Sequence, residues 1–372
     1  MAILPVVLHH LCERAIRTAE DKHLATGSDY TLMNLLPSAY LGVELFFVIS
    51  GLIISYPFIS AYFRGERYPS VRNFYLRRVT RLEPPYFLVM IGCYLFLRFT
   101  GYHPAGTYTF AAEARSLETS LAASIVYMHG LILGGYPKLN PPAWSLEIEI
   151  QFYVLAPIVV LTVLQWRRLV VIVFGILTLI AGSIFASRLL EIQFGPWHAM
   201  LLTKFLHLFL AGLLVNLVIL GGWVPQTMPR AVWDVGFIAA IAILYVIDKH
   251  DGSMLAAAAK VPCYLSLFVA AFEGAFFRRF FSRPWVFTIG GMCYTIYLIH
   301  LPILQVLTEI VMRKSGFDSF MPGLVVSSVV ILPILFGVSV AFFWLIEKPC
   351  MNPNWPLRVG NWIAGRCWMK LR

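Results

Sequence analysis

The sequence contains few charged residues for its length. Only 13% of its 372 residues are charged, 59% are hydrophobic, and the mean hydropathy is +0.76. Apolar runs of roughly twenty residues recur, which is the length that a membrane-spanning helix requires. Lipid tolerates no unpaired backbone amides, and the runs are continuous rather than alternating. The expected fold is therefore all-α, a polytopic membrane bundle, and a β-barrel is excluded.

The sequence also lacks the cysteine spacing of a metal site or a disulfide framework. Its six cysteines are scattered, at Cys12, Cys93, Cys263, Cys293, Cys350 and Cys367. No metal site is expected. No cleavable signal peptide is visible, since "MAILPVVLHH" has neither a basic start nor a small-residue cleavage site. The net charge of +10 does not indicate a nucleic-acid partner, because the basic residues gather at the ends of apolar runs.

Ten apolar runs are expected to cross the bilayer. The first, residues 1–12, is too short to cross alone, so either its helix continues into the polar segment or residues are missing upstream. The others lie at about 39–63, 86–99, 145–165, 169–189, 201–220, 232–247, 255–277, 286–311 and 324–346. An eleventh run, 116–133, is expected to be re-entrant or interfacial, because only then do all the basic loops fall on one side. Both termini are then cytoplasmic.

The stretch "WSLEIEIQFY" places polar residues at the head of one span. A charge inside the bilayer costs about 2.5–3.5 kcal/mol on insertion scales, although acids also cap helix N-termini. Capping explains one glutamate. It does not explain Ser145, Glu149 and Tyr153, which share a helical face by four-residue spacing. Glu149 is therefore the candidate functional residue facing the bundle interior, and Glu147 is expected at the membrane interface.

Five blocks of the chain resemble the acyltransferase 3 family of integral membrane O-acyltransferases. They are "GVELFFVISG" (42–51), "FYLRRVTRLEPPY" (74–86), "WSLEIEIQFYVLAP" (144–157), "YTIYLIHLPI" (294–303) and "EKP" (347–349). The resemblance implies a membrane acyltransferase domain over 1–349, followed by a short basic cytoplasmic tail, 350–372. It also implies a multi-pass protein of the cell (inner) membrane, with acyl-CoA, a hydroxyl acceptor and lipid as its partners.

The implied reaction is transfer of an acyl group, usually acetyl from acetyl-CoA, to a hydroxyl of a sugar or of another cell-envelope or secreted molecule. Acetyl-CoA is then a co-substrate, and no permanently bound cofactor is expected. Nothing in the chain resembles an activated serine, so direct transfer is preferred to an acyl-enzyme. The sequence does not indicate which acceptor is used.

The resemblance makes His10 the catalytic candidate. Family members carry an Arg, ten further residues and then a His at the end of the first span; here His10 takes the His position, and the Arg would precede Met1. Acyl transfer needs a base for the acceptor proton and an acid for the leaving thiolate, and histidine suits both. Glu149 lies near the same outer end and is expected to support the imidazole. The alternative for His10 is an interfacial helix-end residue.

An arginine cluster lies just before Pro84 and Pro85, on the side expected to be cytoplasmic. Arg78 and Arg81 match the family's Arg–x–x–Arg pattern, with Arg77 beside them. Guanidinium binds phosphate in bidentate fashion, so the cluster is expected to hold the phosphates of acyl-CoA. The alternative is a cytoplasmic loop whose charges meet lipid headgroups.

Further residues are expected to support the site. Ser50 and Gly51 are small enough to let a helix or a thioester pass closely. The other supporting residues are Trp144, Ser145 and Tyr153. Tyr294, Tyr297 and His300 follow three-residue spacing, which fits a buried packing row as well as a catalytic role.

A secondary transporter is the rival class, because transporters also bury acids and histidines near the midplane. Their usual signature is an internal repeat with paired broken helices. No convincing repeat is present, and the arginine cluster has no natural partner in that class.

Overall fold

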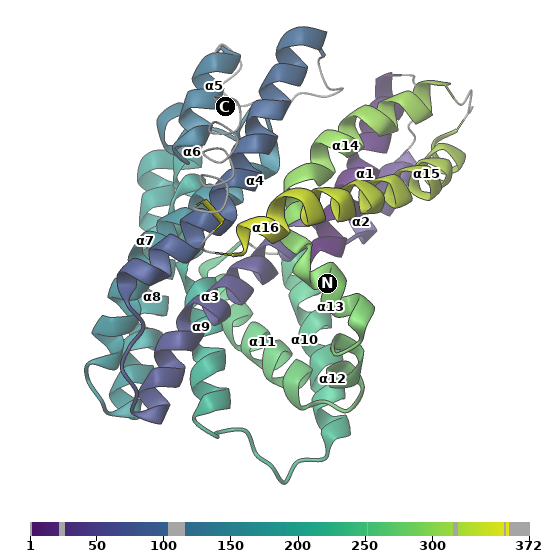
Figure 1. Ribbon diagram of the computed structural model, residues 1–372. Helices are drawn as coiled ribbons and strands as arrows, with labels where there is room; N and C mark the ends of the chain where they lie inside the picture. Colours follow the sequence, from purple (N-terminus) through teal and green to yellow (C-terminus); the bar gives the residue numbers. More distant parts are fainter. Residues whose placement is uncertain are drawn as a thin grey trace, which may run out of the picture.

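The computed structural model describes residues 2–21, 27–102, 116–250, 252–314, 319–352 and 355–356, and all regular structure within them is helical (Figure 1). The first half contains α1 (Ile3–Asp21), α2 (Gly27–Leu35), α3 (Ala39–Arg64), α4 (Val71–Thr100), α5 (Leu117–Ile125), α6 (His129–Leu133), η2 (Pro141–Ala143) and α7 (Trp144–Leu164). The second contains α8 (Leu169–Phe194), η3 (Gly195–Met200), η4 (Leu202–Lys204), α9 (Leu206–Leu220), α10 (Arg230–His250), α11 (Met254–Glu273), α12 (Phe276–Phe281), α13 (Pro284–Gly291), α14 (Cys293–Lys314), α15 (Phe320–Phe342), η5 (Phe343–Glu347) and α16 (Lys348–Cys350). The predicted all-α bundle is confirmed.

Among the described residues, eight helical segments are long and apolar enough to cross a membrane. Two further predicted spans are also helical: α9, which has 15 residues, and α1, whose C-terminal half is charged. The stretch predicted not to cross, 116–133, forms the short helices α5 and α6. At about 1.5 Å per residue neither reaches across a core of about 30 Å. The predicted tail, 350–372, lies almost wholly outside the described residues.

Helix α1 is longer than its apolar run. It continues through the polar segment to Asp21, well past the predicted end at residue 12. The charges of that segment pair along the helix, because residues three and four apart are neighbours on its surface. The polar continuation is therefore part of the bundle rather than a loop.

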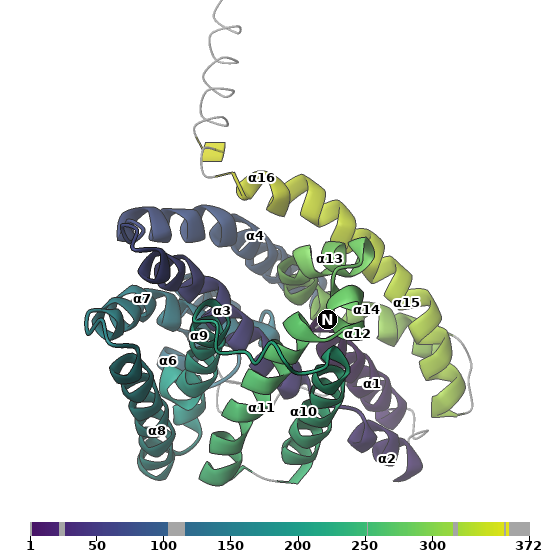
Figure 2. The same cartoon turned by 90° about the horizontal axis from the view of Figure 1, so that it is seen from below.

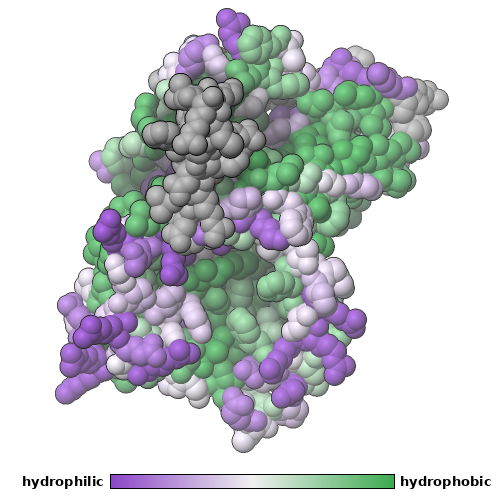
Figure 3. Space-filling view, viewed as in Figure 1, coloured by the Kyte–Doolittle hydropathy of each residue, from purple (hydrophilic) through white to green (hydrophobic). Residues whose placement is uncertain are grey.

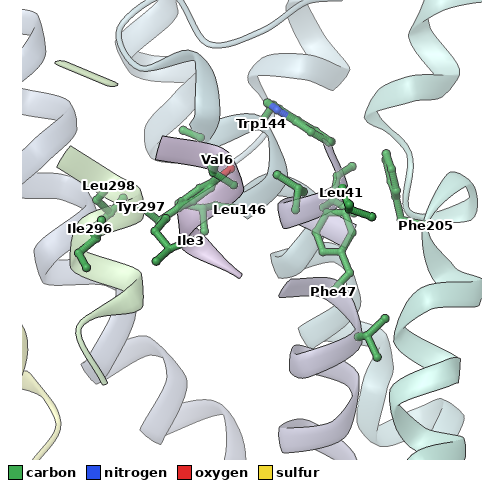
Figure 4. Packing of buried hydrophobic residues seen from close by; sticks show 14 of the residues in the cluster. Ile3, Val6, Leu41, Phe47, Trp144, Leu146, Phe205, Ile296, Tyr297 and Leu298 are labelled. Carbon is green, nitrogen blue, oxygen red and sulfur yellow. The ribbon is translucent and has the colours of Figure 1, made fainter. Parts of the chain in front are cut away.

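The helices that carry the predicted site residues meet in one hydrophobic core. Figure 2 shows α14 near the centre, with α1 and α15 on one side and α3 and α4 on the other. Figure 4 shows side chains of α1, α3, α7 and α14 pointing toward one another. Its labelled residues are Ile3, Val6, Leu41, Phe47, Trp144, Leu146, Phe205, Ile296, Tyr297 and Leu298. This packing fixes the relative positions of the polar residues on the same helices.

Two glycines allow α3 and α9 to cross closely. A Cβ atom on Gly51 would overlap the carbonyl oxygen of Phe209, and one on Gly212 would overlap that of Val48. The side chain of Asn216, on α9, stabilises the crossing by donating a hydrogen bond to the Leu52 carbonyl of α3 at 2.6 Å. Such small-residue contacts are the usual way in which membrane helices approach. Gly51 therefore serves helix packing.

Gly51→Ala is expected to destabilise the protein. The added methyl group must push α9 away, and overpacking of this kind costs about 1–3 kcal/mol. Thermal unfolding of the purified protein in detergent measures the loss. Gly182→Ala on α8 is the matched control, since its Cβ would meet nothing within 4 Å. Equal melting temperatures for the two variants would contradict the tight crossing.

The end of α15 departs from α-helical geometry. Residues Phe343–Glu347 form a π-helical turn before the short helix α16. A π turn contains an extra residue and rotates the side chains that follow it. Glu347 is completely buried as a result, and its carboxylate faces α4 and α14 rather than lipid.

Candidate active site

Seven of the predicted site residues line one cavity of about 1060 Å³, bounded by α3, α4, α7 and α14. They are Ser50, Arg77, Arg78, Arg81, Ser145, Glu149 and Tyr153. Figure 3 shows this face of the molecule hollowed, with hydrophobic residues on the floor and hydrophilic ones around the rim. The arginines predicted to bind the acyl donor and the polar row predicted on α7 thus line the same cavity.

The arginines form the basic wall of the cavity. The Arg78 guanidinium lies over two aromatic rings, 5.4 Å from the Phe74 centroid and 4.9 Å from that of Tyr153. Arg81 Nη2 lies 3.6 Å from Oε1 of the buried Glu347, while its side chain stays 46% exposed. Stacking and this carboxylate orient the guanidinium groups toward the cavity, where planar donors suit phosphate oxygens.

Glu149 lies in the same cavity and accepts two hydroxyl hydrogen bonds. Ser50 Oγ donates to Glu149 Oε1 at 2.5 Å, and the Tyr153 hydroxyl donates to the same oxygen. The four-residue spacing predicted to align Glu149 with Tyr153 does so on α7. Because Arg78 stacks on Tyr153, the carboxylate is connected to the basic wall through one aromatic side chain.

A row of aromatic side chains leads from the cavity toward α1. Tyr297 lines the cavity, and its hydroxyl donates to the Pro142 carbonyl at 2.7 Å while lying 2.5 Å from Ser145 Oγ. The ring centroids of Tyr297 and His300 are 5.6 Å apart, and those of His300 and His10 are 5.4 Å apart. The row therefore separates His10 from the cavity by only two side chains.

His10 is paired with a carboxylate that sequence reasoning missed. Its Nδ1 lies 3.1 Å from Glu13 Oε2, and Glu13 Oε1 accepts from Arg17 Nη2 at 2.8 Å and from Arg17 Nε at 3.1 Å. Since a carboxylate only accepts, the His10 proton is on Nδ1 and Nε2 is left as the basic atom. The expected pairing of His10 with Glu149 is wrong, because Glu149 is held by Ser50 and Tyr153. The spacing i, i+3 in "HHLCE" was the available signal.

Two further expectations differ from the structure. Glu147 was expected at the membrane interface but is 2% exposed, and it accepts from the backbone N–H groups of His129 at 3.2 Å and Gly130 at 2.8 Å. Its carboxylate caps α6, which explains an acid at this position. Trp144 does not line the cavity; its ring stacks with Tyr40 at 5.4 Å within the core.

His300, whose role the sequence left open, is completely buried beside His10. Its Nδ1 donates to the Tyr297 carbonyl at 2.7 Å, so its Nε2 is unprotonated, and that atom has no hydrogen-bond partner in the described structure. Within the same residues, no three His, Cys, Asp or Glu side chains gather as a metal site requires.

The fold and the cavity define a multi-pass membrane protein with a basic internal site. The family model for acyltransferase domains matches residues 1–348, and the chain belongs to this family. The resemblance carried by its five sequence blocks is confirmed.

Curated relatives agree with this assignment. The chain is 25% identical over 301 residues to the O-acetyltransferase OatA of Staphylococcus aureus strain NCTC 8325, covering 72% of this chain and 46% of the relative. The OatA protein of S. aureus strain COL matches with the same identity and coverage. The chain thus spans about half the length of the curated relatives it matches. No solved structure matches the chain.

Proposed function

We propose that the protein transfers an acyl group, acetyl in the first instance, from acyl-CoA to a hydroxyl of a cell-envelope glycan or another exported molecule. One observation carries the proposal: a single cavity runs from Arg77, Arg78 and Arg81 to Ser145 and Tyr297. The rings of Tyr297 and His300 connect this cavity to His10. The names of the relatives, O-acetyltransferases, support a hydroxyl acceptor and an acetyl group.

The donor is proposed to occupy the cavity with its phosphates at the arginines. Guanidinium binds phosphate through paired N–H donors, and three such groups line one wall. The acyl arm then extends past Ser50 and Tyr153, whose hydroxyl groups are oriented by Glu149. Glu149 thus arranges the cavity wall beside the thioester rather than contacting the histidine.

The acceptor is proposed to meet His10. Glu13 holds the proton on Nδ1, so Nε2 removes the proton from the acceptor hydroxyl. The acceptor oxygen forms a bond to the thioester carbonyl carbon, and the carbon–sulfur bond breaks. The imidazolium then returns its proton to the departing thiolate, so that the products are an ester and a free thiol. Glu13, held by Arg17, stabilises the charged ring between these steps.

The positive-inside rule supports the sidedness of this reaction. The Arg77–Arg81 end of the cavity is predicted to face the cytoplasm, where acyl-CoA is made available, and His10 the outer side. The proposed location is the cell (inner) membrane. No permanently bound cofactor is required by this route.

Radiolabelled acetyl-CoA tests the proposal against the transporter alternative. Membranes that contain the protein are incubated with acetyl-labelled donor, and the label should become covalently attached to an envelope component, released by mild base as an ester. Mass spectrometry of envelope glycans with and without the gene should show the loss of an acetyl-sized mass. Label that only crosses the membrane, with no covalent product, would overturn the enzyme proposal.

A further inference from the structure

His300 is a buried histidine with one ring nitrogen that packing does not explain. Its side chain is completely buried on α14, and Nδ1 donates to the Tyr297 carbonyl at 2.7 Å. A carbonyl only accepts, so the proton is on Nδ1 and Nε2 is a bare acceptor. Within the described residues Nε2 has no hydrogen-bond partner. Buried polar atoms in folded proteins are normally paired, so an unpaired one points to a partner that arrives during function.

The ring of His10 lies beside this unpaired nitrogen. The two ring centres are 5.4 Å apart, and the ring planes are tilted by 37°. A ring nitrogen lies about 1 Å from the ring centre, so the facing ring edges are about 3–4 Å apart, close to hydrogen-bond length. At rest both Nε2 atoms are acceptors, because Glu13 holds the His10 proton on Nδ1. Two acceptors cannot bond, but one proton added to His10 makes it a donor to His300.

His300 also lies on the way from His10 to the donor cavity. Its ring is 5.6 Å from that of Tyr297, which lines the cavity. His9 is the other imidazole near His10, at 5.9 Å and edge-on, but it belongs to α1 and is partly exposed. An acyl arm that reaches His10 from the cavity passes His300, so the sulfur atom of the thioester lies on the His300 side.

We propose that His300 carries the proton from His10 to the departing thiolate. His10 Nε2 takes the proton from the acceptor hydroxyl as the acceptor oxygen bonds to the thioester carbonyl carbon, and passes it to His300 Nε2. The carbon–sulfur bond breaks, and His300 gives the proton to sulfur. The products are the ester and the free thiol, and both histidines end neutral. This inference rests on the proposed function and adds a second proton-carrying residue to it.

Burial restricts the exchange of this proton to the reaction. His300 is shielded from water, so its proton comes from His10. On its other side, the Tyr297 carbonyl accepts a hydrogen bond but does not take up a proton. The proton path therefore ends at His300 while the cavity is empty, and a thiolate completes it.

His300→Asn is the direct test. The asparagine amide can still donate to the Tyr297 carbonyl, but no atom replaces Nε2. Initial rates are measured in membranes as base-labile label transferred from acetyl-labelled acetyl-CoA. The variant should lower kcat at least about tenfold, since acid–base groups contribute about 10²–10⁴-fold, and leave KM for acetyl-CoA nearly unchanged. His300→Gln places an amide near the Nε2 position and should not restore the rate, because an amide does not take up a proton.

An oxygen-ester analogue of acetyl-CoA separates proton delivery from disturbed packing. A thiol is a far stronger acid than an alcohol, so a thiolate leaves without a proton much more readily than an alkoxide. His300→Asn should therefore lose at least about tenfold more rate with the oxygen ester than with acetyl-CoA. A variant that only disturbs packing slows transfer from both donors by the same factor.

His207→Asn on α9 is the matched control. His207 is also buried, its Nδ1 also has no partner among the described residues, and it does not line the donor cavity. The control should leave kcat and the ratio between the two donors unchanged. Gel filtration and acetyl-CoA binding show that each variant is folded. A folded His300→Asn protein that transfers at the wild-type rate, or that loses rate equally with both donors, overturns the proton-carrying role and leaves the acyl transfer standing. No ester label from the wild-type protein contradicts the proposed function itself.

Discussion

His10→Ala is expected to lower kcat for acyl transfer by about 10²–10⁴-fold, the range that general acid–base groups contribute. Glu13→Gln should lower kcat substantially as well, because a carboxamide keeps the shape but cannot stabilise a charged imidazole. Both variants should insert and bind acetyl-CoA normally, since neither residue lines the donor cavity. Initial rates at saturating acetyl-CoA measure the effect.

The rates of double variants show which carboxylate acts together with His10, because residues that act as one unit share a single loss of rate. The double variant of His10→Ala and Glu13→Gln should lose no more than His10→Ala alone, because the two residues act as one unit. Adding Glu149→Gln to His10→Ala should lower the rate further, since Glu149 arranges a different part of the site. Glu191→Gln is the control: its carboxylate pairs with Arg188 at i, i+3 on an exposed face and should be neutral. A non-additive pair of His10 and Glu149 would restore the pairing first expected from the sequence.

Replacing Arg78 and Arg81 together with alanine is expected to raise KM for acetyl-CoA by roughly 10–100-fold. A hydrogen bond to a charged group contributes about 1.5–3 kcal/mol, and the exposure of Arg81 reduces its share. The KM for the acceptor should change little. Lysine at both positions should restore only part of the affinity, because an ammonium group does not bind phosphate in bidentate fashion.

Arg278 and Arg279 supply the matched control for the arginines. They lie on α12, are predicted to face the cytoplasm as well, and do not line the cavity. Replacing both with alanine removes the same charge without touching the proposed donor site. If the two double variants gave the same KM for acetyl-CoA, the Arg78 cluster would serve membrane topology only.

Local patterns were enough to predict most of the fold and one wall of the site. Hydropathy alone finds helical segments at all the predicted spans, because lipid demands apolar side chains on a hydrogen-bonded backbone. It does not find the breaks within them, since 255–277 runs from α11 into α12 and 286–311 is divided between α13 and α14. Four-residue spacing likewise put Glu149 and Tyr153 on one face. Glu13 was missed because the hydropathy of α1 falls at its charges, although its spacing from His10 is a local signal.

The remaining errors concern partners that are distant in sequence. Glu147 caps a helix formed by another segment, so nothing near it indicates that His129 and Gly130 are its donors. From the sequence, Gly51 could allow either a helix or a thioester to pass closely. The structure shows that it is the helix α9 that crosses there. Helix patterns show which side chains share a face, but not which neighbour covers that face.

The aromatic row of Tyr297 and His300 has a consequence for the permeability of the membrane. In the proposed reaction, the donor cavity is open to the cytoplasm while His10 serves the outer side. Tyr297 and His300 fill the space between them, and both are buried. A continuous water path would let protons leak down the gradient that the cell maintains. In the proposed reaction these two side chains must therefore move aside for the thioester to meet the acceptor at His10, and between reactions they keep the membrane electrically sealed.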